Sequence, residues 1–212
     1  MISAREEMLA RVRAALSDVP AGERAQHVAV PRRYRREGEL GAAERLERFT
    51  QRVADYRATV HRLAAEPELP ALLARVLAAE QVVLPPGLPA PWVPEGLSVV
   101  PDRELTHAQL DAADGVLSGC AVAVAETGTI VLDSGPTCGR RALTLLPDHH
   151  VCVVLGAQVV ETVPEALARL GEAVRAGRPV TFVSGPSATS DIELSRVEGV
   201  HGPRRLDVVL VG

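Results

Sequence analysis

The sequence has no lysine and no asparagine, so arginine supplies all 23 of its basic side chains other than histidine. A Schiff-base lysine and the lysine of a phosphate-binding P-loop are therefore excluded. Aromatic residues make up only 2% of the chain, too few for a platform that stacks nucleic-acid bases. The net charge of −4 also argues against nucleic acid or an anionic membrane surface as the main partner.

Cysteine is scarce as well, with only Cys120, Cys138 and Cys152. An odd number without a C-x-x-C pair favours a reducing compartment over a disulfide framework, and it does not supply the four thiolates of an iron–sulfur cluster. We find no signal peptide and no run of ~18 apolar residues that would span a membrane. We therefore expect a cytoplasmic protein.

The apolar residues, 47% of the chain, suffice for a sizeable core. Apolar spacing in the first 80 residues predicts three helices, one around Leu9, Val12 and Leu16 and two over 41–65 and 68–79. We therefore assign residues 1–80 to an N-terminal helical extension and residues 81–212 to an α/β domain.

Beyond residue 80, short apolar strands alternate with helices. The predicted strands are 81–85, 97–101, 115–119, 120–128, 129–133, 150–156, 179–185 and 205–212, and the predicted helices are 106–113 and 163–176. Strands that are apolar on both faces and interleaved with helices are typical of a mostly parallel sheet covered by helices. The sequence therefore predicts an α/β sandwich.

The loop 184–193 (SGPSATSDIE) is the first candidate site, because ligands of open α/β sheets bind beyond the carboxyl ends of strands. It offers hydroxyls, a carboxylate and backbone N–H groups suited to an anion. Its candidate ligand-binding residues are Ser184, Gly185, Ser187, Thr189, Ser190, Asp191 and Glu193. The alternative is an ordinary strand–loop–helix connection.

His201 is the second candidate, since Gly202 and Pro203 would present its ring at a loop tip just before the last strand. Histidine titrates near neutral pH and can act as an acid, a base or an anion donor. The alternative is a structural histidine whose ring bonds to a backbone carbonyl.

Glu126 is the third candidate, because it interrupts an apolar strand and a buried carboxylate needs a partner or a function. Thr127 follows it, and Gly128 indicates a tight turn or a close backbone approach. The alternative is a hairpin with Glu126 at its solvent end. Arg140 and Arg141, after a glycine-rich loop, are suited to binding a carboxylate or phosphate.

Three weaker features favour structural interpretations. The basic run 32–36 (RRYRR) is short in an acidic chain, so it indicates a solvated linker more than an RNA or lipid contact. His149 and His150 lack a further ligand at helical spacing, which favours the start of a strand over a metal site. Cys138 has no adjacent histidine, which favours an unreactive thiol.

Three segments together resemble the LUD domain family, in particular its lactate utilization C proteins. They are ETGTIVL (126–132), SGPSATSDIEL (184–194) and VHGPRRLDVVLVG (200–212), and the resemblance covers roughly residues 80–212. The family is expected to carry a basic residue in its GPS-x-T loop, where this chain has Ala188.

The resemblance implies a sandwich similar to the NagB/RpiA/CoA-transferase fold. It also implies a non-redox accessory or ligand-binding role in bacterial oxidation of L-lactate to pyruvate, beside iron–sulfur subunits. The alternative is a stand-alone enzyme acting on a small anionic or CoA- or phosphate-bearing substrate, with Glu126 as base or nucleophile and His201 as acid or base. The sequence leaves open the ligand and the oligomeric state, including a homo-oligomer.

Overall fold

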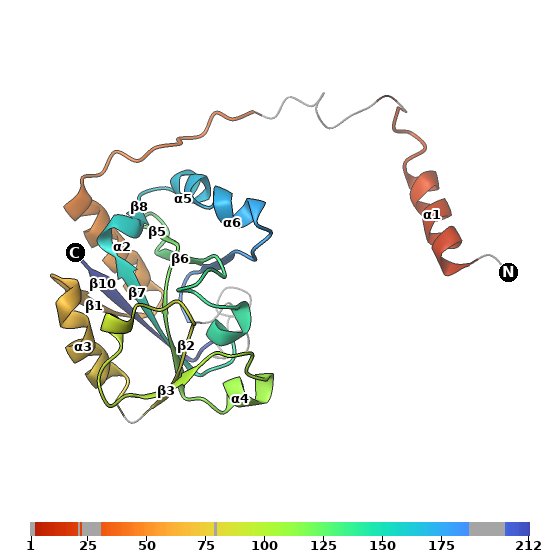
Figure 1. Ribbon diagram of the computed structural model, residues 1–212. Coiled ribbons are helices and arrows are strands. Elements are labelled where there is room, and N and C mark those ends of the chain that lie inside the picture. The colour runs from red at the N-terminus through yellow and green to blue at the C-terminus, as the bar shows by residue number, and fades with distance from the viewer. Residues whose placement is uncertain (1–2, 21, 23–30, 79, 187–201) are drawn as a thin grey trace. The chain divides into compact units, whose positions relative to one another are not determined.

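The computed structural model describes residues 3–20, 22, 31–78, 80–186 and 202–212 (Figure 1). The chain divides into two compact units, residues 1–34 and 35–212. This division differs from the boundary at residue 80 that we expected from the sequence. The reason is that β1 (Thr59–Leu63) is a strand of the main sheet of the second unit.

The first unit contains α1 (Ala4–Ala15). The Glu6 N–H donates to Ser3 Oγ at 3.2 Å, and the Ser3 N–H donates to Glu6 Oε2 at 2.8 Å. This reciprocal capping box satisfies N–H groups that the first helical turn leaves free. The helix predicted around Leu9 is thereby confirmed, and none of its side chains is buried.

The second unit is built on a six-stranded sheet in the order β1-β10-β7-β4-β2-β3. Besides β1, its strands are β2 (Gln81–Leu84), β3 (Ser98–Pro101), β4 (Gly115–Gly119), β7 (His149–Leu155) and β10 (Arg205–Val211). All neighbouring pairs are parallel. The prediction of a mostly parallel sheet is confirmed for this part of the fold.

A smaller, mixed sheet has the order β8-β5-β6-β9. Its strands are β5 (Val122–Val124), β6 (Thr129–Leu132), β8 (Val159–Val160) and β9 (Thr181–Val183). β6 is antiparallel to both β5 and β9, whereas β8 is parallel to β5. The predicted strands at 120–133 and 179–185 therefore form a separate sheet and do not extend the main one.

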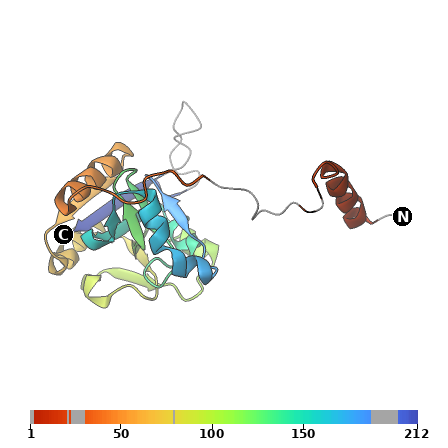
Figure 2. The same cartoon turned by 90° about the horizontal axis from the view of Figure 1, so that it is seen from above.

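Helices pack against both faces of the main sheet and against the outer face of the small sheet (Figures 1 and 2). The helices are α2 (Ala42–Asp55), α3 (Leu69–Val76), α4 (His107–Asp111), α5 (Val163–Arg169) and α6 (Gly171–Arg175). Single 3₁₀ turns are η2 (Glu66–Glu68), η3 (Ala90–Trp92), η4 (Arg141–Thr144) and η5 (Gly156–Gln158). The predicted helix 163–176 is thus two short helices, and the Thr162 side chain caps the first one by accepting from the Glu165 N–H.

Four apolar clusters define the layers. One face of the main sheet packs on α3, where Leu73 meets Val153 and Val209. The opposite face packs on α2 and the small sheet, with Phe49, Val208 and Ile130 in one cluster. The outer face of the small sheet packs on α5, and α4 covers β2 and β4. The architecture is therefore a two-sheet α/β sandwich.

The predicted helix 41–65 is wrong over its last third. α2 ends at Asp55, and Arg57 has a φ of 65°, a left-handed conformation that ends a helix. The chain then forms β1, in which Val60 packs toward one apolar cluster and Leu63 toward another. Apolar spacing that suits a helix also suits a strand buried on both faces, and pairing of β1 with β10 decides between them.

A membrane-crossing helix is not found in the described part of the chain, where every helix is too short or too polar.

Candidate functional site

Three hydroxyl groups lie end to end where the small sheet meets the loop after β9. Thr129 Oγ1 is 2.7 Å from Thr127 Oγ1 and 2.7 Å from Ser184 Oγ. The antiparallel register of β6 and β9, with Ile130 opposite Val183, brings Thr129 and Ser184 together. The structure thereby joins two of the three segments on which the resemblance rests.

Gly128 makes the turn between β5 and β6. Its φ is 62°, and a Cβ at this position would lie 2.7 Å from the carbonyl carbon of Arg52 and 2.8 Å from the nitrogen of Val53. Both alternatives expected for this glycine therefore hold, because it makes a tight turn and also lets α2 approach closely.

Glu126 lies at the end of the hairpin, with about half of its side chain exposed (51%). Its Oε1 is 3.5 Å from Arg35 Nη2, and its N–H donates to the carbonyl of Glu161 at 3.0 Å. Glu126 therefore lies at the solvent end of a hairpin, which is the structural interpretation that the sequence left open. A half-exposed carboxylate beside the hydroxyl chain remains accessible to a ligand.

Gly185 and Gly202 bring the ends of two candidate segments together. Gly185 has a φ of 89°, and a Cβ there would lie 2.9 Å from Tyr56 Cβ. A Cβ at Gly202 would lie 2.7 Å from the carbonyl oxygen of Pro186. The base of the loop that begins at Ser184 therefore adjoins the segment that leads into β10.

Several predicted site residues lie outside the described residues. They are Ser187, Thr189, Ser190, Asp191, Glu193 and His201.

Glu161 is a residue that the sequence reasoning missed. It is 2% exposed, and its carboxylate accepts hydrogen bonds from the N–H groups of Glu39 (2.6 Å) and Leu40 (2.7 Å) and from Arg35 (2.8 Å). The bond from Leu40, followed by those from Glu39 and Arg35, lowers the pKa of this carboxyl although burial opposes the shift. Like Glu126, it is a carboxylate within an apolar run.

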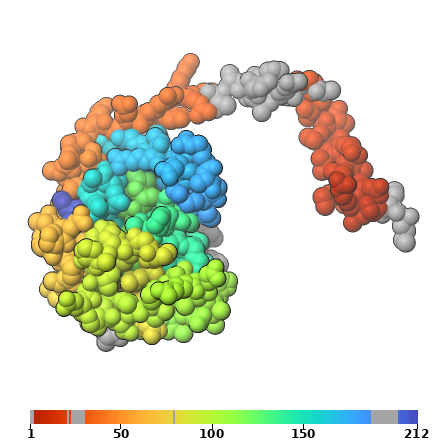
Figure 3. Space-filling model, in the orientation of Figure 1, coloured from red at the N-terminus to blue at the C-terminus, as the bar shows by residue number. Residues whose placement is uncertain are grey.

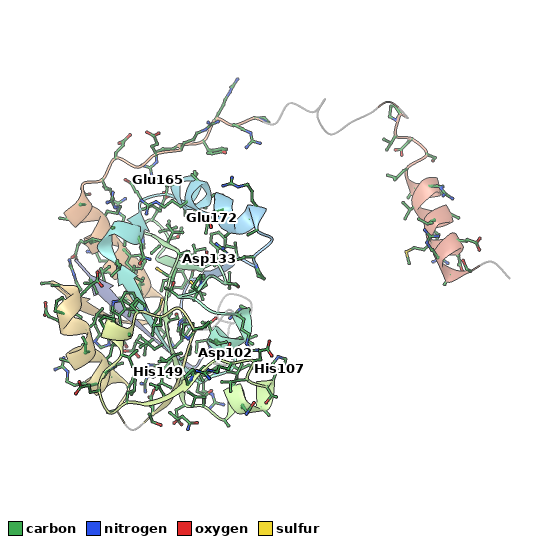
Figure 4. The ribbon with its side chains drawn as sticks, in the orientation of Figure 1. Asp102, His107, Asp133, His149, Glu165 and Glu172 are labelled. Atoms are coloured by element: carbon green, nitrogen blue, oxygen red, sulfur yellow. The ribbon has the colours of Figure 1, made fainter. Side chains whose placement is uncertain are left out.

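We call residues 35–40 the strap, because Glu161 ties them to the small sheet. Thr162 Oγ1 also donates to the carbonyl of Arg36 at 3.5 Å. In Figure 4, Glu165 at the start of α5 lies near the strap, whereas His149 lies toward the other end of the α/β unit. The basic run 32–36 therefore provides, through Arg35, an ion pair to Glu126 and another to Glu161.

Arg140 is engaged by protein groups. Its Nε and Nη2 donate to the two oxygens of Asp102 at 2.8 and 2.9 Å, and Nη2 also donates to the carbonyl of Leu105. These bonds from Arg140 lower the pKa of Asp102. Arg141 is partly buried and donates to Thr144 Oγ1 at 3.1 Å, and burial lowers its pKa. Arg140 thus joins η4 to the loop after β3.

His149 belongs to a charged cluster at the amino ends of β7 and β10. Its Nε2 is 2.8 Å from Asp207 Oδ2, and its Nδ1 is 2.8 Å from Glu80 Oε2. His61 Nε2 lies 2.7 Å from the other oxygen of Asp207. Although burial opposes the shift, hydrogen bonds to His149 and His61 lower the pKa of Asp207. His149 is the first residue of β7, in agreement with the strand start that the sequence favoured over a metal site.

The thiols are buried. Cys138 is 1% exposed, and burial raises its pKa to about 12, so the thiol is protonated and weakly nucleophilic at neutral pH. His150, 1% exposed, lies 2.8 Å from Ser118 Oγ, a pair that solvent does not reach. Among the described residues, no three His, Cys, Asp or Glu side chains are arranged to hold a metal ion.

The sequence and the fold both match known proteins. The family model of the LUD domain matches residues 46–211. The chain is 54% identical over 175 residues to "Lactate utilization protein C" of Deinococcus radiodurans, a match that covers 82% of each chain. It is 34% identical over 128 residues to "Lactate utilization protein C" of Geobacillus thermodenitrificans, covering 57% of this chain and 53% of that one.

A solved structure is also similar. The crystal structure of a DUF162 family protein from Deinococcus radiodurans superposes with a TM-score of 0.73 at 48% identity. The match covers 82% of this chain and all of that one.

Proposed function

Since the chain belongs to the LUD domain family, we propose that it is a component of a bacterial L-lactate utilization system. In this proposal it is a non-redox accessory or ligand-binding subunit that works beside iron–sulfur subunits, which oxidise L-lactate to pyruvate. The observation that carries the proposal is the long match to the D. radiodurans protein named for lactate utilization. The function is transferred from that relative.

The cysteine content supports the accessory role. The sequence has three cysteines, and an iron–sulfur cluster is usually held by four thiolates. We therefore assign electron transfer to the partner subunits. The cysteines are free, which suits a reducing compartment, and we place the protein in the cytoplasm.

We propose that the ligand is a small anion, or a molecule that carries CoA or phosphate, and that Glu126 and the hydroxyls of Thr127 and Ser184 help to bind it. The hydroxyl chain supports this site because hydroxyls can donate to an anion. Ala188 provides no charge there, so backbone N–H groups and hydroxyls would hold the ligand.

Co-purification from lactate-grown cells of the native host tests the proposal. The full chain, tagged at the chromosomal locus and at native expression, should recover proteins with the visible absorbance of iron–sulfur clusters. A tagged, unrelated cytoplasmic protein from the same cells is the control. Recovery of this chain alone would contradict an accessory role.

A separate assay tests the alternative, that the protein is a stand-alone enzyme. The purified chain and the Glu126→Gln variant would be compared on CoA thioesters and sugar phosphates. If the wild type turns over one of these substrates and the variant does not, the protein is an enzyme and the accessory role is wrong. If both show the same background rate, the stand-alone enzyme is excluded for these substrates.

A further inference from the structure

A cleft that none of the above uses lies at the carboxyl edge of the main sheet. Ala64, Leu155 and Val211 line it from the ends of β1, β7 and β10, and Arg45 and Leu46 line it from α2. In Figure 3 the last residues of the chain form a small dark-blue patch beside the orange atoms of α2. The cleft has a volume of about 510 Å³, which is within the usual size of small-molecule sites.

Arg45 is the unusual residue of this cleft. Its Nε is buried, and no group in the described part of the chain accepts a hydrogen bond from it. Arg45 precedes the fully buried Phe49 by one helical turn, so the base of its side chain faces the core. By contrast, Arg48 and Arg52 on the same helix face Glu44 and Asp55.

A buried donor without an acceptor is rare in proteins and calls for an explanation. Because Arg45 is cationic and lines the cleft, the acceptor that its Nε lacks is best supplied by an anionic ligand. Ala42, the first residue of α2, also lines it, and no side chain caps that end of the helix. Free N–H groups and the positive end of the helix dipole favour an anion there.

The acidic and apolar groups around the cleft restrict the ligand further. Glu66 is the one acidic side chain among the described lining residues, and its carboxylate accepts from Trp92 Nε1 at 3.0 Å. The remaining side chains of the wall are apolar, with Leu46, Leu155 and Val211 the largest. With Glu66 bonded to Trp92, Arg45 is the one basic side chain among the described lining residues, and it suits a single anionic head attached to an apolar body.

We propose that this cleft binds a small organic carboxylate, whose oxygens accept from Arg45 and whose apolar body lies against Leu46, Leu155 and Val211. The site is separate from the hydroxyl chain at Thr129 and does not depend on the proposed role in lactate utilization. Carboxylate and guanidinium form a charge-assisted pair, which is stronger than a hydrogen bond between neutral groups.

Isothermal titration of the full chain with hexanoate tests the proposal, with hexanol as the uncharged probe. Arg45→Gln removes the charge and keeps a long polar side chain, and Ala64→Phe fills the cleft without changing charge. Arg48→Gln is the matched control, because it removes an arginine from the same helix outside the cleft. Circular dichroism melts show whether each variant folds. If Arg45→Gln does not fold, the binding of hexanoate to Ala64→Phe decides whether the cleft is the site.

We expect saturable binding of hexanoate to the wild type and to Arg48→Gln, and no binding of hexanol at the same concentrations. The folded Arg45→Gln and Ala64→Phe variants should bind hexanoate roughly tenfold more weakly or worse, since a charge-assisted bond is lost or the space is filled. The absence of saturable binding to the wild type, or unchanged affinity in either variant, would overturn the proposal.

Discussion

Thr129 Oγ1 and Ser184 Oγ lie 2.7 Å apart although 55 positions separate the two residues in the chain. The contact joins the turn of the β5–β6 hairpin to the end of β9. It places the hydroxyls of two sequence motifs in one hydrogen-bonded chain, and the half-exposed Glu126 stands at the start of the same turn.

Replacing Thr129 with valine should break this chain with almost no change of shape. Thr129 is 6% exposed, so its loss leaves Thr127 and Ser184 without their shared partner. We expect the free energy of unfolding to fall by about 1–2 kcal/mol in urea titrations. Thr50→Val is the control, because the Thr50 hydroxyl donates to the carbonyl of Leu46 within its own helix. Equal effects of both substitutions would contradict a stabilising role of the hydroxyl chain.

Gly128→Ala should be far more harmful than Gly177→Ala. Both glycines have positive φ angles, 62° and 66°, but only Gly128 faces a neighbouring backbone, whereas nothing lies within 4 Å of a Cβ at Gly177. The control should cost about 1–2 kcal/mol from its backbone conformation alone. Gly128→Ala adds overpacking against α2 and should reach about 2–5 kcal/mol in total. Similar unfolding free energies for the two variants would refute the close approach to α2.

Much of this architecture follows from the sequence, because it is encoded locally. Buried strands such as β4 (GVLSG) and β7 (HHVCVVL) are mostly apolar on both faces, and Thr162 caps α5 through the hydroxyl that the sequence provides. The parallel sheet then follows from the alternation of strands and helices. Gly128 indicates a tight turn or a close backbone approach from the sequence alone, and both are found, with a φ of 62°.

The misassigned and missed features depend on contacts between distant residues. The apolar spacing of Val60 and Leu63 suits either a helix or a strand, and only the pairing with β10 selects β1. The small sheet requires β6 to meet β9 across about 50 residues, a pairing that no local pattern reveals. The donors to Glu161 come from Glu39 and Leu40, more than 100 positions earlier in the chain, so no pattern around Glu161 predicts them.

Glu161→Gln should release the strap without unfolding the sheets. The carboxylate accepts from the N–H groups of Glu39 and Leu40, and a neutral amide oxygen accepts more weakly. We expect these two amides to exchange with solvent deuterium faster in the variant, as measured by NMR. Amides of β7 provide the internal reference and should be unchanged. Unaltered exchange at Glu39 and Leu40 would show that the strap is held by other contacts.

Asp207→Asn should destabilise the charged cluster that includes His149 and His61. Asp207 is 5% exposed and its carboxylate contacts both imidazoles, so its loss leaves their ring nitrogens without this partner and costs on the order of 1–3 kcal/mol. Because the pKa of Asp207 is below its ordinary value of 3.8, its contribution is present above that pH and is lost as the pH falls through the lowered pKa. Urea unfolding should therefore separate wild type from variant at neutral pH and bring them together in acid. A difference that does not shrink below pH 3.8 would contradict this assignment.

Growth on L-lactate tests the central claim most directly. Deletion of the gene in its native host should abolish or strongly slow growth with L-lactate as the sole carbon source, and it should leave growth on pyruvate intact. The wild-type gene supplied on a plasmid should restore growth on L-lactate. Unimpaired growth and unchanged L-lactate oxidation in the deletion strain would contradict a role in lactate utilization.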